Sequence, residues 1–166
     1  MLQKILKLCR RTEKKTINDI MNKQSAREEF IDHNAKKLFD IVLDIEKYPE
    51  FIPWCQYMKI HSRKDNEIYA DMYILYKFFL PQKLGSHVVF NKKKLNIKTV
   101  YVDGPLKDLK TTWNFEPINS KKTLVNFSID FEFKKFLHQK LAEVLYSFLE
   151  NKMIDSFKKR ANYILN

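Results

Sequence analysis

Between residues 68 and 133 the hydrophobic positions recur at every second residue, in five successive runs. The runs begin at Ile68, Leu84, Leu95, Leu109 and Thr123, with turn residues such as Asp103-Gly104-Pro105 between them. Alternation with a period of two gives each strand one covered face and one face in water. Strands of this kind pair in antiparallel sheets, so the pattern predicts an antiparallel sheet.

After this region the period changes to three and four residues. Apolar side chains from Leu137 to Ile164 keep that spacing over about 28 residues, which makes roughly 42 Å of helix. Upstream, residues 27–31 form a strand candidate, and Asn34 stands where an N-cap would precede a helix over residues 35–43. The order predicts an α+β fold in which a curved antiparallel sheet wraps around one long C-terminal helix. The pattern leaves open whether the space between them is a cavity or a closely packed core.

The composition fits a single folded domain with a basic extension. With 166 residues, 45% of them hydrophobic, the chain can build one real core and is not disordered. Its formal charge of +11 favours anionic partners, namely membrane surface, RNA or acidic protein. Residues 1–24 hold seven basic and two acidic side chains, and we expect them to extend from a folded domain at residues 25–166. The extension suits a targeting peptide, a membrane-surface helix or a solvated tail.

The sequence offers little catalytic chemistry. Cys9 and Cys55 form no CxxC pair, and the four histidines show neither HxH nor HExxH spacing, so we expect no metal site. Neither a G-x-S-x-G elbow nor a plausible Cys-His nucleophile pair occurs. We therefore expect a protein that is not an enzyme and holds no catalytic cofactor.

Three short motifs follow one another along the chain. They are Asp44-Ile45-Glu46-Lys47-Tyr48-Pro49-Glu50-Phe51-Ile52-Pro53-Trp54-Cys55, then Asp103-Gly104-Pro105-Leu106 with Trp113-Asn114-Phe115, then Asp130-Phe131-Glu132-Phe133. Together they resemble the coenzyme Q-binding family of START-like proteins, in the polyketide cyclase/dehydrase superfamily. The resemblance covers about residues 25–164, with Leu106 where phenylalanine is usual. It implies a helix-grip fold, and a START-like coenzyme Q-binding domain at residues 25–166.

The family has two branches with different implied functions. One resembles a chaperone that binds ubiquinone and supports respiratory electron transport and quinone synthesis. The other resembles a ribosome-association toxin, which binds the large ribosomal subunit and inhibits subunit joining. Pro53-Trp54-Cys55 and the segment 137–142 look more like the ubiquinone branch, which is therefore the first prediction. That prediction implies the matrix face of the mitochondrial inner membrane in a eukaryote, or the cytoplasm or the cytoplasmic face of the inner membrane in a bacterium. Respiratory or quinone-synthesis proteins are implied as further partners.

A ubiquinone carrier needs a long apolar groove and a few hydrogen-bond donors near the quinone head. The inward-facing candidates for the isoprenoid tail are Ile74, Val88, Trp113, Phe127, Phe131, Leu141, Leu145 and Phe148. The candidates for the head are Tyr76, Ser86, Thr99 and Tyr101, which interrupt apolar faces. The alternative is that all twelve build an ordinary core.

Two further features concern the surface. Phe78, Phe79 and Leu80 lie between lysines and suit insertion into an anionic membrane interface, or else fold back onto the core. The basic clusters are Lys92-Lys93-Lys94, Lys121-Lys122, Lys134-Lys135 and Lys158-Lys159-Arg160. They can contact ribosomal RNA or anionic lipid, or simply be solvated. Because no aromatic stacking platform is interleaved with them, nucleic acid is the weaker hypothesis.

Overall fold

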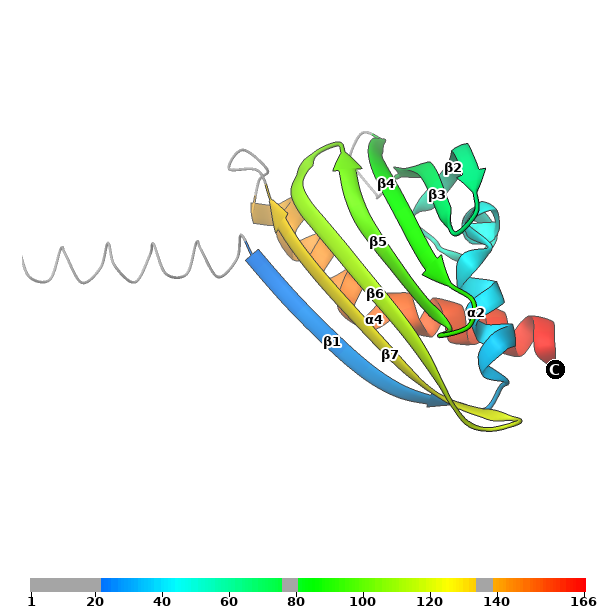
Figure 1. Ribbon diagram of the computed structural model, residues 1–166. Coiled ribbons are helices and arrows are strands. Elements are labelled where there is room, and N and C mark those ends of the chain that lie inside the picture. Colours follow the sequence, from blue (N-terminus) through cyan, green and yellow to red (C-terminus); the bar gives the residue numbers. More distant parts are fainter. Residues whose placement is uncertain (1–21, 76–80, 134–138) are drawn as a thin grey trace, which may run out of the picture.

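The fold is a single curved sheet packed against helices (Figure 1). The computed structural model describes residues 22–75, 81–133 and 139–166, with the side chains of the last helix described from Lys152 onward. The sheet has seven strands in the order β1-β7-β6-β5-β4-β3-β2, and every neighbouring pair is antiparallel. The predicted α+β architecture, with a curved antiparallel sheet and a long C-terminal helix, is confirmed.

The strands are β1 (Asn22–Ile31), β2 (Cys55–Lys64), β3 (Glu67–Ile74), β4 (Gln82–Asn91), β5 (Asn96–Asp103), β6 (Leu106–Asn119) and β7 (Lys122–Phe133). The helices are α2 (Ala35–Leu43), the 3₁₀ turn η1 (Ile45–Lys47), α3 (Tyr48–Phe51) and α4 (Gln139–Leu165). The five alternating runs correspond to β3 through β7. The sequence pattern missed β2, and it predicted only the second half of β1.

The core lies between the concave face of the sheet and the helices. Its centre is a row of paired residues across three strands, Ile97 on β5, Trp113 on β6 and Phe127 on β7, each almost fully buried. From α2, the ring of Phe39 packs edge-on against the rings of Phe90 and Phe115, with centroids 6.5 and 6.0 Å away. The sheet supplies one wall of the core, and the helices supply the other.

The C-terminal half of α4 packs through one narrow stripe. Ile154, Phe157 and Ala161 are buried and lie three and four residues apart, so they share one face of the helix. No helix among the described residues is long and apolar enough to cross a membrane. The helix therefore packs on the sheet through a limited apolar face and leaves polar positions exposed.

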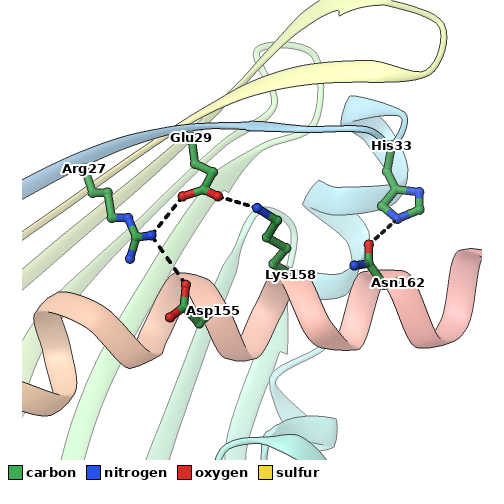
Figure 2. A network of polar contacts seen from close by, with 6 residues as sticks. All are labelled: Arg27, Glu29, His33, Asp155, Lys158 and Asn162. Carbon is green, nitrogen blue, oxygen red and sulfur yellow. Dashed lines mark hydrogen bonds and ion pairs between the residues drawn. The ribbon is translucent and has the colours of Figure 1, made fainter.

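A polar network fixes this half of α4 to the edge strand β1 (Figure 2). Glu29 on β1 accepts hydrogen bonds from Lys158 of α4 and from Arg27, whose Nη2 lies 2.9 Å from the carboxylate. The Lys158 ammonium holds the pKa of Glu29 below its usual range. Arg27 also reaches Asp155 at 3.4 Å, and His33 Nε2 lies 2.8 Å from Asn162 Oδ1. These contacts position the helix over the sheet.

Candidate functional site

An apolar cavity lies between the concave sheet face and the helices. Its volume is about 120 Å³, and residues of β2 to β7, α2, η1, α3 and α4 contribute to its wall. The lining residues are Val42, Ile45, Tyr48, Trp54, Met58, Met72, Ile74, Leu84, Gly85, Ser86, Val88, Ile97, Thr99, Leu109, Thr111, Trp113, Phe127, Ile129, Met153 and Phe157. This set contains no carboxylate, imidazole, ammonium or guanidinium group. The cavity is therefore suited to an uncharged, largely apolar ligand.

The strand register explains how hydroxyl groups reach this apolar wall. Val88 on β4 pairs with Thr99 on β5, Thr99 pairs with Thr111 on β6, and Thr111 pairs with Ile129 on β7. Directly paired residues point to the same face of a sheet, so the two threonines lie side by side on the cavity wall. Neither threonine hydroxyl makes a hydrogen bond to another described residue. These two hydroxyls are therefore available to a ligand as far as the described residues are concerned.

Two other hydroxyls in the lining are already used by the protein. Ser86 Oγ donates to the carbonyl oxygen of Ala70 at 3.1 Å. Tyr48 Oη donates to the carbonyl oxygen of Val42 at 2.5 Å, and burial raises the pKa of Tyr48 far above its usual range. A ligand would have to displace an internal hydrogen bond to use either donor, which makes them weaker candidates for the quinone head.

The motif around Pro49 builds the wall opposite the sheet. Pro49 occupies the first turn of α3, where its missing N–H costs no hydrogen bond. This short helix turns Tyr48 and Phe51 toward α4, where their rings lie 5.2 and 5.1 Å from the ring of Phe157. Trp54, three residues past the end of α3, is 4% exposed and lines the cavity. The first resemblance motif therefore shapes the cavity.

Six of the twelve predicted ligand residues line this cavity: Ile74, Ser86, Val88, Thr99, Trp113 and Phe127. Phe131 is buried in the core and is absent from the lining. Tyr101 lies away from the cavity, beside Gly104 and the Leu106 amide, and its buried hydroxyl makes no hydrogen bond of ordinary geometry with a described residue. The side chains of Leu141, Leu145 and Phe148 lie outside the described part of α4. Tyr76 also lies outside the described residues. That any of them binds a ligand stays a prediction.

Sequence reasoning missed several residues of the wall. Thr111 belongs to the same alternating run as Trp113, so its inward direction was available from the sequence. Met58 comes from β2, which was not predicted, and so could not be placed. Met153 and Phe157 belong to the apolar stripe of the C-terminal helix, but a stripe alone does not reveal which residues face an empty space and which face packed neighbours.

The one described cysteine is buried and inert. Cys55 is 5% exposed, and burial raises the pKa of its thiol to about 11. Its sulfur lies 3.9 Å from the carbonyl oxygen of Tyr57. A neutral thiol in this setting is a poor nucleophile. Among the described residues no group of three or more His, Cys, Asp or Glu side chains is placed to hold a metal ion.

The predicted surface features fall partly inside and partly outside the described residues. Phe78, Phe79 and Leu80, and the pair Lys134-Lys135, lie outside the described residues. Of the C-terminal cluster, Lys158 is paired with Glu29, and Arg160 lies 2.6 Å from Glu50 and over the ring of Phe51. Those two cations therefore hold α4 in place. The cluster at residues 92–94 lies in the β4–β5 turn, and the pair at residues 121–122 lies where the β6–β7 turn meets β7, which begins at Lys122.

Comparisons with known proteins agree with this architecture. Residues 31–158 match the family model described as "Polyketide cyclase / dehydrase and lipid transport". The ribosome association toxin RatA of Rickettsia prowazekii is 36% identical over 137 residues, which cover 80% of this chain and 92% of that protein. The mitochondrial coenzyme Q-binding protein COQ10 homolog B of Xenopus laevis is 29% identical over 135 residues, which cover 79% of this chain and 54% of that protein.

A solved structure shares the fold at low sequence identity. The Zhui aromatase/cyclase from Streptomyces sp. R1128 superposes with a TM-score of 0.77 at 11% identity, covering 87% of this chain and 96% of that one. The fold therefore occurs in enzymes as well as in proteins named for binding. With the family model covering most of the domain and a relative above a third identical, this chain belongs to the polyketide cyclase/dehydrase and lipid transport family, of START-like helix-grip fold.

Proposed function

We propose that this protein associates with the ribosome and has no catalytic step of its own. The observation that supports this best is the extent of the similarity to RatA, which is 36% identity across 92% of that protein. The similarity to the Xenopus coenzyme Q-binding protein is 29% and spans 54% of its length. This reverses the order expected from the sequence, in which ubiquinone binding came first. Under this proposal the protein acts where bacterial ribosomes are, in the cytoplasm.

Trp54 lies in one of the two segments that favoured the ubiquinone branch, and its position explains why it discriminates poorly. The side chain is almost fully buried, and it fills space between α3 and the sheet. A residue in such a place is constrained by the volume around it. Trp54 shapes the wall of the cavity and does not lie on the outer surface, so its identity does not by itself separate the two branches.

Subunit joining tests the proposal directly. Purified small and large ribosomal subunits are mixed with and without the protein, and the joined fraction is measured on a sucrose gradient. We expect the protein to lower the joined fraction in proportion to its concentration. Normal joining at a large excess of protein would contradict the proposal.

Ubiquinone binding is the second candidate, and the cavity supports it. The hydroxyls of Thr99 and Thr111, which make no hydrogen bond to a described residue, face a mostly apolar space, as a quinone head and its tail would require. The volume of about 120 Å³ is below the roughly 300–1,000 Å³ of common small-molecule pockets, so the cavity would have to widen for a whole ubiquinone. Under this candidate ubiquinone is a bound ligand, and the protein works at a quinone-containing membrane.

Extraction of the purified protein with organic solvent, followed by mass spectrometry, separates the two candidates. Stoichiometric ubiquinone that disappears when Val88 is replaced by Asp would support the second. If protein purified from a quinone-rich source contains no quinone, that result counts against ubiquinone binding. Because the cavity and the outer surface are separate, this result leaves ribosome association to its own test.

A further inference from the structure

Three lysine groups that are far apart in the sequence lie at one end of the fold. We call these seven lysines the basic end; they are Lys36, Lys37, Lys92, Lys93, Lys94, Lys121 and Lys122. They belong to the first turn of α2, the β4–β5 turn and the β6–β7 turn, which Figure 1 shows at the same end of the sheet. Asn34 Nδ2 donates to the carbonyl oxygen of Ser120 at 3.3 Å, so the start of α2 touches the β6–β7 turn. Phe115 N donates to Leu95 O at 3.1 Å, which joins the β4–β5 turn to β6.

An asparagine side chain fixes the backbone of each lysine group. Asn34 Oδ1 accepts from the backbone amides of residues 36 and 37 at 3.0 and 3.3 Å. Asn91 Oδ1 accepts from the amides of residues 93 and 94 at 3.0 and 2.9 Å. Asn119 Oδ1 accepts from the amide of residue 121 at 2.9 Å. Because these segments are already ordered, docking them onto a partner costs less conformational entropy than ordering free loops would.

The charge of the basic end is largely uncompensated. Segments 32–37, 91–95 and 116–122 together hold seven lysines and two acidic side chains. Lys36 is paired with Asp40 at 2.7 Å, whereas the other six lysines make no ion pair with a described residue. By contrast, Lys83, Lys107 and Lys110 on the sheet are each paired with a carboxylate. Lysines without an ion pair to a described residue also occur on the sheet, such as Lys59 and Lys98, but six of them are grouped at this end.

The chemistry of the turn tips distinguishes RNA from a lipid surface. A membrane-inserting turn carries large apolar side chains beyond its cations. Here the tips are Asn91-Lys92-Lys93-Lys94 and Asn119-Ser120-Lys121-Lys122, whose own side chains are all polar; Ile118, beside the second tip, is 50% exposed. One aromatic ring is nearby, since Phe30 is 57% exposed with Lys122 Nζ 5.2 Å from its centroid. Lysines with an adjacent exposed ring fit a phosphate backbone and a stacked base.

We propose that the basic end is the surface by which this protein contacts RNA phosphates, an inference that rests on the proposed ribosome association. The lysines act as point charges that release counterions from the RNA backbone, and the turns set their spacing. The cavity lies inside the domain and does not contribute lysines to this surface. Binding through the basic end is then strongly dependent on salt, and it does not require the cavity to be filled.

A pair of double variants tests the proposal in the full chain. Lys93→Gln with Lys122→Gln removes two charges from the basic end, and Lys59→Gln with Lys98→Gln removes two from exposed lysines of β2 and β5 that make no ion pair with a described residue. The dissociation constant for large ribosomal subunits is measured by cosedimentation at several salt concentrations. If each lysine contacts one phosphate, the first variant weakens binding about 25- to 60-fold at 0.1 M salt and makes the salt slope shallower by about 1.4 to 1.8. The second variant is expected to bind like wild type, and the charge-preserving Lys93→Arg with Lys122→Arg to restore most of the affinity.

The outcomes separate this inference from the proposed function. If the wild type binds subunits and both Gln variants keep this binding, or lose it equally, the role of the basic end is overturned while ribosome association stands. Failure of the wild type to bind subunits, with binding to naked ribosomal RNA that only the first variant loses, overturns the proposed function and supports the basic end. If the wild type binds phosphatidylglycerol vesicles and no RNA, or binds none of these, the RNA assignment of the basic end is overturned.

Discussion

Filling the cavity with a larger side chain should stabilise the protein and block ligand entry. Thr111 is a suitable position because it faces the cavity and its hydroxyl has no described partner. A cavity of about 120 Å³ costs about 3 kcal/mol of stability at ~24 cal/mol per Å³. Thr111→Phe places a ring in part of this space, and we expect it to raise the free energy of unfolding by about 1–2 kcal/mol. For a chain of this size that is a rise in melting temperature of roughly 2–8 °C.

The same variant should weaken binding of a quinone probe. The protein has two tryptophans, Trp54 and Trp113, and both line the cavity, so a bound quinone should quench their fluorescence. Titration with a ubiquinone of short isoprenoid tail measures the affinity, which Thr111→Phe should weaken by at least about tenfold, or ~1.4 kcal/mol. The matched control is Thr112→Phe, because the next residue of the strand points to the opposite face of the sheet.

The reasoning would be refuted by a destabilised variant that still binds. Overpacking a filled core costs about 1–3 kcal/mol, so a fall in melting temperature would mean that the space at Thr111 is not empty. Quenching that is unchanged in Thr111→Phe would mean that the quinone binds elsewhere. A loss of binding in both Thr111→Phe and Thr112→Phe would indicate a general disturbance of β6.

Three other substitutions or treatments give further checks. The folded-state pKa of Glu29 is lowered, so the contribution of its carboxylate to stability is present above the ordinary glutamate pKa and is lost as the pH falls through the folded-state pKa. Glu29→Gln should therefore lower the free energy of unfolding by about 1 kcal/mol near neutral pH and by little in acid, as measured by urea unfolding. Alkylation of Cys55 at pH 8, followed by mass spectrometry in a Cys9→Ser background, should be much slower than that of a free thiol, and rapid labelling would contradict its burial. Gly104 has a φ of 133°, and a Cβ there would lie 2.3 Å from the carbonyl oxygen of Lys83. Gly104→Ala should therefore lower the free energy of unfolding by about 2–3 kcal/mol, and a wild-type melting temperature would contradict that strain.

The sequence predicted the parts of the fold in which one face is buried and the other is wet. The strands β3 to β7 alternate cleanly because the helices cover their inner face and water covers the outer one. The strand β2 was missed for two physical reasons. It lies at the edge of the sheet, so most of its residues are exposed, and irregularities near Tyr57 and between Ile60 and Ser62 break its register with β3. Without a sustained alternation there was no pattern to detect.

The candidate site was predictable only in part. Alternation gives the direction of a side chain, and this was enough to place residues such as Val88 and Thr99 on the inner face. It does not say where packing stops, and so Phe131, which is packed in the core, could not be told from Phe127, which lines the cavity. Similarly, the lysine clusters were visible in the sequence, but only the folded chain shows that Lys158 is paired with Glu29 while Lys93 makes no ion pair with a described residue.

Cosedimentation with isolated large ribosomal subunits tests the central claim most directly. The purified protein is layered with subunits on a sucrose gradient at low and at high salt, and its position is read by immunoblot. The account predicts that the protein travels with the large subunit at low salt and returns to the top of the gradient as salt rises, because the contact is electrostatic. Protein that stays at the top of the gradient at every salt concentration would contradict ribosome association.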